Sequence, residues 1–262
     1  MRGTRLVALD VDGTLMTYDG VISDDVRAAV TALVDAGVHV VLATGRGAHS
    51  AVPVAFELGL SDAYVVCSNG AVTVRLDGDS FDVVDAVTFD PGPALQAIAL
   101  EMPDALCAVE DLGTGYRVSA PFPSGELTGE ISVVPFDELI AQPATRVVIR
   151  APGVEPEEFS ALVERVGLHE VEYAIGWTAW LDLSPHGVSK ATALEEVRRR
   201  LGVEPFATVA VGDGGNDLQM LQWAARGVAM GHASAAVRAV ADEVTGTIED
   251  DGVLSILRDL LP

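Results

Sequence analysis

The stretch Leu6–Leu15, LVALDVDGTL, decides the fold of this chain. Its residues from Leu6 to Asp10 are a short apolar run that ends in a turn, which predicts a buried strand of a parallel sheet. Asp10 then lies at the carboxyl end of the strand, where open α/β sheets place their ligands. Asp12 follows two residues later, and carboxylates this close need a cation or a shared proton. The alternative for an isolated Asp-x-Asp is a solvated capping turn.

The composition allows a large core and disfavours polyanionic partners. The chain has 262 residues, of which 49% are hydrophobic and 21% charged, enough for one large domain or two of ordinary size. Its formal net charge of −23 argues against binding nucleic acid through phosphates and against an anionic membrane surface. A phosphate-bearing substrate would therefore need a metal and a few local cations to attract it.

Nothing in the sequence indicates export or membrane insertion. Two cysteines are too few for a disulfide framework. The first apolar stretch breaks at Asp10, which is too early for a signal peptide, and no run approaches the roughly 18 apolar residues of a membrane span. We therefore expect a cytoplasmic protein that is a monomer or a homodimer.

Strand-like and helical patterns alternate at both ends of the chain. A helix is expected to begin at Ser23 and end at Gly37, because a capping residue and two acids precede an apolar stripe. The other expected elements are strands at Val38–Ala43, Tyr64–Cys67 and Thr208–Val211 and a hairpin of Val72–Leu76 with Phe81–Val84. Helices are expected to end near Leu58, to run from Ser189 to about Leu201, and to run from Asn216 to Ala225. This alternation predicts an α/β fold with a parallel sheet.

The middle of the chain has a different composition. It contains many Pro and Gly residues and most of the aromatic residues. Helical stretches at Gly92–Glu101 and Glu155–Val166 alternate with strand-like runs at Arg146–Arg150 and Glu170–Ile175. We therefore expect an inserted smaller α/β domain over residues 84–183, with residues 1–83 and 184–262 forming the core.

Polar residues follow the expected strands of the core: Asp10, Thr44, Ser68-Asn69 and Asp213. Since parallel strands end at one edge of their sheet, these side chains are expected to meet there. Thr44 with Gly45 suits a phosphate oxygen, because a hydroxyl and exposed backbone N–H groups both donate. Taken alone, Thr-Gly-Arg is more often an ordinary strand-to-helix turn.

Lys190 is the only lysine of the sequence, and every other basic residue apart from histidine is an arginine. Keeping a single lysine suggests a place that requires a compact ammonium group. Its position in the first turn of an expected helix also favours the ligand edge of the sheet. The alternative is a surface lysine present by chance.

The segment GDGGND, Gly212–Asp217, is not a dinucleotide fingerprint, because Asp217 occupies its last position. Asp213 and Asp217 instead offer the hard oxygen ligands that Mg²⁺ prefers. Asn216 is expected both as a helix N-cap and as a hydrogen-bonding residue for a ligand.

Four segments in this order resemble the haloacid dehalogenase (HAD) superfamily of phosphoryl-transfer enzymes. They are DVDGT at residues 10–14, ATGR ending at Arg46, GVSK ending at Lys190, and GDGGND. DLSPHGVSK, VAVGDGGNDLQML, GVAMGHAS and EDDGV further resemble the Cof-like branch, whose large α/β cap closes over the site. His232 departs from that branch, which usually has Asn there, and Asp182 stands where Glu is frequent.

The resemblance implies a Rossmann-like three-layer core with a parallel sheet and an inserted α/β cap domain. It also implies a Mg²⁺-dependent phosphatase that acts on a small phosphorylated metabolite, such as a sugar phosphate, through an aspartyl-phosphate. The implied catalytic residues are Asp10 as nucleophile, Asp12 as general acid and base, Thr44 and Lys190. The implied substrate-binding residues are Thr44, Gly45, Arg46, Asn69, Lys190 and Asn216, and the implied metal residues are Asp10, Asp12 through its backbone carbonyl, Asp213 and Asp217.

Two other functions remain open at this stage. A phosphomutase would share the nucleophile but return the phosphoryl group to its substrate. A non-catalytic phosphate-sensing regulator also uses Asp, Thr and Lys around Mg²⁺, although such a switch has no use for Asp12. Within the cap, four residues either line a pocket for the leaving group or belong to the core: Arg117, Tyr173, Trp177 and Trp180.

Overall fold

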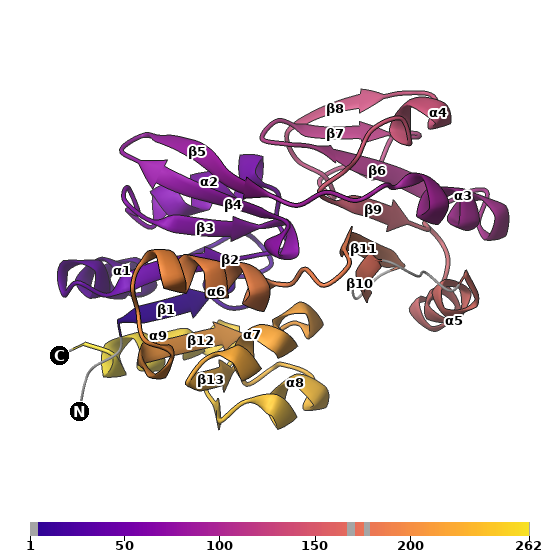
Figure 1. Cartoon of the computed structure of the whole chain (residues 1–262). Helices are drawn as coiled ribbons and strands as arrows, with labels where there is room; N and C mark the ends of the chain where they lie inside the picture. Colours follow the sequence, from indigo (N-terminus) through magenta and orange to yellow (C-terminus); the bar gives the residue numbers. More distant parts are fainter. Residues whose placement is uncertain (1–4, 167–170, 176–178, 262) are drawn as a thin grey trace. The chain divides into compact units, whose positions relative to one another are not determined.

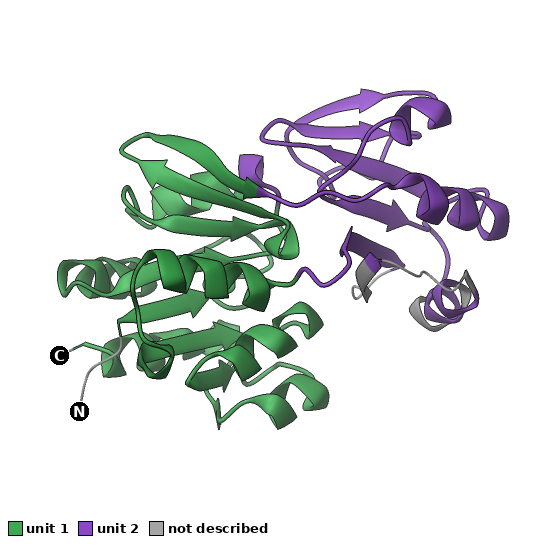
Figure 2. Ribbon diagram, in the orientation of Figure 1, with its two compact units in different colours: residues 1–46, 51–85, 189–262 green, residues 47–50, 86–188 purple. Residues whose placement is uncertain are grey.

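The computed structural model describes residues 5–166, 171–175 and 179–261 and has two compact units (Figures 1 and 2). Unit 1 contains residues 1–46, 51–85 and 189–262, and unit 2 contains residues 47–50 and 86–188. The role of the inserted segment as a cap stays a prediction. No helix within the described ranges is long and apolar enough to cross a membrane.

Unit 1 is built on an eight-stranded sheet with the order β14-β13-β12-β1-β2-β3-β4-β5. Its strands are β1 (Leu6–Leu9), β2 (His39–Ala43), β3 (Tyr64–Cys67), β4 (Val72–Asp77), β5 (Ser80–Ala86), β12 (Thr208–Gly212), β13 (Arg226–Ala229) and β14 (Glu243–Val244). All pairs from β14 to β3 are parallel, and β4 runs antiparallel to β3. The predicted α/β class with a parallel core is confirmed, and β4 and β5 extend it on one side.

Helices cover this sheet. They are α1 (Asp24–Asp35), α2 (Ala48–Glu57), α6 (Lys190–Arg200), α7 (Leu218–Trp223), α8 (Ala235–Val240) and α9 (Gly252–Asp259), with 3₁₀ turns η1 (Ser68–Gly70), η2 (Pro205–Ala207), η3 (Gly215–Asp217) and η4 (Ile248–Asp250). Leu6 and Ala8 of β1 pack with α6, α7 and α8. Val7 and Leu9 are equally buried and point to the opposite face, because side chains alternate along a strand. Burial of both faces explains the continuous apolar run of β1.

Unit 2 has a six-stranded sheet with the order β10-β11-β9-β6-β7-β8. The strands are β6 (Leu106–Asp111), β7 (Gly115–Val118), β8 (Glu130–Val133), β9 (Val147–Arg150), β10 (Val171–Ile175) and β11 (Trp180–Pro185), and the helices are α3 (Gly92–Glu101), α4 (Phe136–Leu139) and α5 (Pro156–Val166). Val109, Ile149 and Leu181 pack beneath α3 and α5, with Phe159 fully buried in this cluster.

The two faces of the unit 2 sheet separate residues that the sequence grouped together. Arg117 is paired with Val109, which faces α3 and α5, whereas Trp180 packs with Val148 on the other face. Of the two alternatives left open for these residues, a single pocket lined by both Arg117 and Trp180 does not fit these opposite faces. Trp177 lies outside the described residues, as does the side chain of Tyr173.

The expected helix starts are confirmed in two places and wrong in one. The hydroxyls of Ser23 and Ser189 accept the N–H groups of Val26 and Thr192 and cap α1 and α6. Asn216 is not an N-cap, because it lies inside η3 and α7 begins only at Leu218. Its side chain instead donates a hydrogen bond to Asn69 of η1.

Candidate active site

The strand order of unit 1 places the polar strand tips beside one another. β1 lies between β12 and β2, with Leu9 paired to Val211 on one side and Leu42 on the other. Asp10 follows β1 directly, and its N–H donates to the carbonyl of Val211 at 3.0 Å. Asp213 and Thr44 follow the neighbouring strands at the same edge. The expected meeting of strand tips is therefore present.

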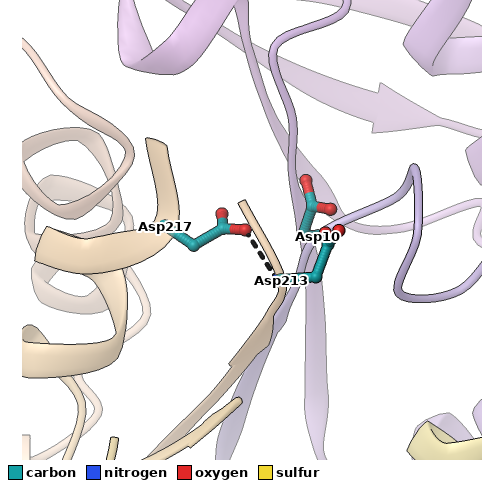
Figure 3. A group of neighbouring side chains, drawn as sticks. All are labelled: Asp10, Asp213 and Asp217. Carbon is teal, nitrogen blue, oxygen red and sulfur yellow. Dashed lines mark hydrogen bonds between the residues drawn. The ribbon is translucent and has the colours of Figure 1, made fainter. Parts of the chain in front are cut away.

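Three carboxylates form the centre of the site (Figure 3). Asp10, Asp213 and Asp217 are buried, and each offers an oxygen within 4.8 Å of the others. The Lys190 ammonium is also buried and donates to Oδ1 of Asp10 at 2.7 Å and to Oδ1 of Asp217 at 2.6 Å. The single lysine of the chain thus bridges two acids that come from different strand ends.

A close contact between backbones fixes Lys190. Lys190 is the first residue of α6, and it follows the N-cap Ser189, which forms a capping box with Thr192. Gly70 of η1 has a φ of +104°, and a Cβ there would lie 2.2 Å from the carbonyl oxygen of Ser189. Only glycine permits this approach, so the turn after β3 sets the position of the helix that carries Lys190.

The electrostatics show an excess of negative charge. Burial raises the pKa of Asp10 well above its usual range, and Asp217 adds to the rise, while Lys190 opposes it. Burial and Asp217 likewise raise the pKa of Asp213. Burial would lower the pKa of Lys190, but Asp10 and Asp217 raise it above its usual value. One ammonium does not balance three carboxylates, so the donor set fits a hard divalent cation.

Asp217 mainly holds the loop after β12. Its Oδ1 accepts from Lys190, and its Oδ2 accepts the backbone N–H groups of Asp213 at 3.0 Å and Gly214 at 2.9 Å. A Cβ on Gly212 would lie 2.5 Å from the carboxyl carbon of Asp217. The glycine is needed so that the carboxylate can fold back onto its own turn.

Asp12 stands apart from this cluster. Its carboxylate binds the guanidinium of Arg46 through two hydrogen bonds, of 2.8 and 2.6 Å. Arg46, expected as a substrate contact, is thus placed beside Asp12. The Asp12 carboxylate does not belong to the group of acids that could hold a metal among the described residues.

The remaining predicted residues meet at the turns after β2 and β3. The Thr44 hydroxyl accepts the N–H of Arg46 at 3.1 Å, and the Thr44 carbonyl accepts the N–H of Asn69 at 3.1 Å. Asn216 donates to Oδ1 of Asn69 at 2.9 Å, and a Cβ on Gly45 would lie 3.2 Å from that same oxygen. Thr44, Gly45, Asn69 and Asn216 therefore share one small region. Asn69 has a φ of +54°, in the left-handed region that asparagine tolerates better than most residues other than glycine.

Sequence reasoning missed the contacts to Asp213. The Tyr18 hydroxyl donates to Oδ2 of Asp213 at 3.0 Å, and Thr14 donates to Oδ1 at 3.4 Å. His232, noted only as a departure from the family pattern, has Nε2 3.4 Å from Oδ2. Burial and Asp213 raise the pKa of Tyr18, so the phenol stays a donor. No periodic pattern marks Tyr18, because it lies in an irregular turn.

Comparisons with known proteins agree over nearly the whole chain. The family model described as haloacid dehalogenase-like hydrolase matches residues 7–109 and 124–257. The 5-amino-6-(5-phospho-D-ribitylamino)uracil phosphatase YitU of Bacillus subtilis is 27% identical over 97% of this chain and 96% of its own. The phosphoglycolate phosphatase of Methanoculleus marisnigri is 28% identical over 98% of this chain and 97% of its own.

A solved structure extends the likeness to three dimensions. BT1666 from Bacteroides thetaiotaomicron, described among the phosphatases of the HAD superfamily, has a TM-score of 0.79 and is 27% identical. The match covers 98% of this chain and 95% of the other.

Proposed function

Because the chain belongs to the haloacid dehalogenase-like hydrolase family and is a phosphatase of its Cof-like branch, we propose that it hydrolyses a small phosphorylated metabolite through an aspartyl-phosphate on Asp10, with Mg²⁺ as cofactor. The observation that carries the proposal is the position of Lys190, bonded to both Asp10 and Asp217 inside a buried cluster of acids. Burial of an ammonium and three acids at a strand edge costs stability, which is expected of a catalytic site.

Asp10 is the proposed nucleophile. Lys190 is bonded to Oδ1, which leaves Oδ2 as the attacking oxygen. As the bond from this oxygen to phosphorus forms, the bond from phosphorus to the leaving oxygen breaks. Lys190 offsets the negative charge that Asp10 and the phosphoryl group bring together.

Asp12 is the proposed proton carrier. It first donates a proton to the leaving oxygen, and then takes a proton from the water that attacks the aspartyl-phosphate. That second attack breaks the bond between phosphorus and Asp10 and releases inorganic phosphate. Arg46 keeps the Asp12 carboxylate in place between these transfers.

The turns after β2 and β3 are proposed to hold the phosphoryl oxygens. The hydroxyl of Thr44, the backbone at Gly45 and the side-chain amides of Asn69 and Asn216 supply donors there. Arg46 is a further proposed contact. Phosphoryl transfer depends on positioning and charge stabilisation, which these groups provide.

The acids fit Mg²⁺ through the chemistry of their oxygen atoms. Asp10 and Asp213 would hold the ion, with the Asp12 backbone carbonyl and Asp217 in support. When bound, Mg²⁺ neutralises negative charge on the phosphoryl group.

The leaving group is the least specified part of the proposal. The relatives named above act on a ribitylamino-uracil phosphate and on phosphoglycolate at nearly equal identity to this chain. We therefore propose only the class of small phosphorylated metabolites, with residues 84–183 as a cap that selects among them. A cytoplasmic location and a monomeric or homodimeric state also remain predictions.

Release of inorganic phosphate tests the proposal. The purified chain is assayed with Mg²⁺ on p-nitrophenyl phosphate and on a panel of phosphorylated metabolites, and again in excess chelator. We expect Mg²⁺-dependent release that Asp10→Asn abolishes, because the amide is nearly isosteric but a poor nucleophile. If the variant keeps more than about a tenth of the wild-type rate, its activation barrier has risen by less than about 1.4 kcal/mol. That result would show that Asp10 is not the nucleophile. Transfer of phosphate within the substrate without release would identify a mutase.

A further inference from the structure

Side chains from two separate loops lie against the carboxylate of Asp213. Tyr18, in the loop after β1, donates its hydroxyl to Oδ2 at 3.0 Å. His232, in the loop after β13, places Nε2 3.4 Å from the same oxygen. Thr14 makes the remaining contact, at 3.4 Å to Oδ1. Among the described residues, Oδ2 therefore lies beside two side chains, whereas Oδ1 has one long contact.

The tautomer of His232 follows from its other ring nitrogen. Nδ1 accepts the backbone N–H of Ile248 at 3.3 Å. A neutral imidazole that accepts at Nδ1 carries its hydrogen on Nε2. That hydrogen is therefore on a buried nitrogen that lies 3.4 Å from Oδ2 of Asp213 and has no hydrogen-bond partner among the described residues, whereas Tyr18 donates to Oδ2 directly.

Gly13 makes room for this arrangement. Its φ is +81°, and a Cβ would lie 2.5 Å from Oδ2 of Asp213 and 2.7 Å from the Tyr18 hydroxyl. The hydroxyl and the carboxylate meet in the space that a side chain would otherwise fill. The Tyr18 residue is 61% exposed, so its partly buried contact with Asp213 is made by the hydroxyl end of a largely solvated side chain.

We propose that Tyr18 and His232 are positioning residues that fix the Asp213 carboxylate by its Oδ2 and turn Oδ1 toward the metal. This inference rests on the proposed function, in which Asp213 holds Mg²⁺. Partners that hydrogen-bond a ligating carboxylate orient it, and their loss typically weakens metal binding by about 10- to 100-fold.

The first test is Tyr18→Phe, which removes the hydroxyl and keeps the ring. Mg²⁺ is titrated into the full chain by calorimetry without substrate, so that the readout is binding and not turnover. We expect a dissociation constant about tenfold higher than in the wild type. Tyr64→Phe is the matched control, because the Tyr64 ring lies against Arg75 and not at the site. It should bind Mg²⁺ as the wild type does.

Two substitutions separate the roles of the His232 nitrogens. His232→Asn keeps an acceptor for the Ile248 N–H but is too short to reach Asp213, whereas His232→Gln places an amide near the position of Nε2. We expect about tenfold weaker Mg²⁺ binding for His232→Asn and a change of less than about threefold for His232→Gln.

The outcomes distinguish this inference from the proposed function. Wild-type affinity in both Tyr18→Phe and His232→Asn would overturn the positioning roles while leaving the metal site intact. Absence of Mg²⁺ binding in the wild type, or equal binding by Asp213→Ala, would instead overturn the proposed metal. Weaker binding in Tyr18→Phe and His232→Asn, with His232→Gln and Tyr64→Phe close to wild type, supports the inference.

Discussion

The guanidinium of Arg46 holds both carboxylate oxygens of Asp12, with Nε 2.8 Å from Oδ2 and Nη2 2.6 Å from Oδ1. A two-point contact of this kind fixes orientation as well as distance. Asp12 is therefore kept apart from the acids around Lys190, although it follows Asp10 by only two residues. In the proposed mechanism, this arrangement separates the acid that would transfer protons from the acids that would hold the metal.

Asp12→Ala is expected to convert a phosphatase into an enzyme that stops at the aspartyl-phosphate. Nitrophenolate leaves without needing a proton, whereas attack of water on the intermediate needs a base. With p-nitrophenyl phosphate we expect a burst of about one nitrophenolate per site and a steady rate reduced about 10²- to 10⁴-fold. Rapid-mixing absorbance measures both phases, and Asp10→Asn, which lacks the nucleophile, should show no burst. A steady rate close to wild type would contradict the role of Asp12.

Lys190→Met should remove activity and also destabilise the fold. The substitution leaves Asp10 and Asp217 buried without their cation, and breaking a buried ion pair from one side costs about 3–5 kcal/mol. Urea denaturation measures the free energy of unfolding. Arg199→Met is a control, because its ion pairs with Glu195 and Glu196 are at the surface and worth roughly 0–1 kcal/mol. Equal losses in the two variants would contradict a special role for the buried lysine.

The strand tips show why much of the site could be predicted from the sequence. A short apolar run predicts β1, a parallel sheet has one carboxyl edge, and Asp10, Thr44 and Asp213 directly follow their strands. The caps at Ser23 and Ser189 are also local, since each involves a bond spanning only three residues. Local chemistry of this kind is visible without the fold.

Contacts between distant segments could not be predicted in this way. Tyr18 and Asp213 are 195 residues apart in the sequence, and nothing in the turn around Tyr18 indicates its partner. Asparagine is common at helix N-caps, but the Asn216 side chain instead donates to Asn69, 147 residues away. Only the register of the unit 2 strands shows that Arg117 and Trp180 lie on opposite faces of their sheet.

Gly70→Ala should disturb the position of Lys190. The new Cβ would lie 2.2 Å from the Ser189 carbonyl oxygen, so the start of α6 must shift. We expect a loss of activity together with lower stability. Gly78→Ala is a matched control with φ +59° and nothing within 4 Å, and it should cost only the left-handed backbone penalty of about 1–2 kcal/mol. Thermal unfolding and phosphate release are measured on both. If Gly70→Ala and Gly78→Ala have the same stability and the same activity, α6 tolerates the contact with the new Cβ at residue 70.

Trp180→Phe tests whether the inserted segment selects the leaving group. Trp180 donates Nε1–H to Asp182 at 2.9 Å, and Asp182 also accepts from Arg146 at 2.6 Å. Loss of the donor should change kcat/KM unequally across phosphorylated metabolites and least for p-nitrophenyl phosphate. The same loss on every substrate, together with a lower Tm, would show that Trp180 serves only the core of unit 2. Trp177→Ala is expected to give the same unequal pattern.

Asp213→Asn should stabilise the metal-free protein while removing its activity. Burial and Asp217 raise the pKa of Asp213 in the folded state above the value of 3.8 expected when unfolded. The folded state then binds more protons than the unfolded state, so the free energy of unfolding falls as pH rises above about 4. An asparagine at this position keeps a carbonyl oxygen that can accept from Tyr18 but carries no charge. The free-energy cost of burying an ionised carboxylate therefore disappears.

Thermal melts in chelator and in Mg²⁺ measure this effect. In chelator at pH 8 we expect the Tm of Asp213→Asn to exceed that of the wild type by about 2–4 °C, which corresponds to roughly 1 kcal/mol in a chain of this size. The difference should shrink as the pH falls below 3.8, where the carboxyl group becomes protonated in the unfolded state as well. Saturating Mg²⁺ should reverse the order, because it stabilises the wild type through binding to the folded state and the variant much less. If the variant is instead less stable than the wild type in chelator at pH 8, the donors around Asp213 stabilise its carboxylate without a cation. That result would contradict this prediction.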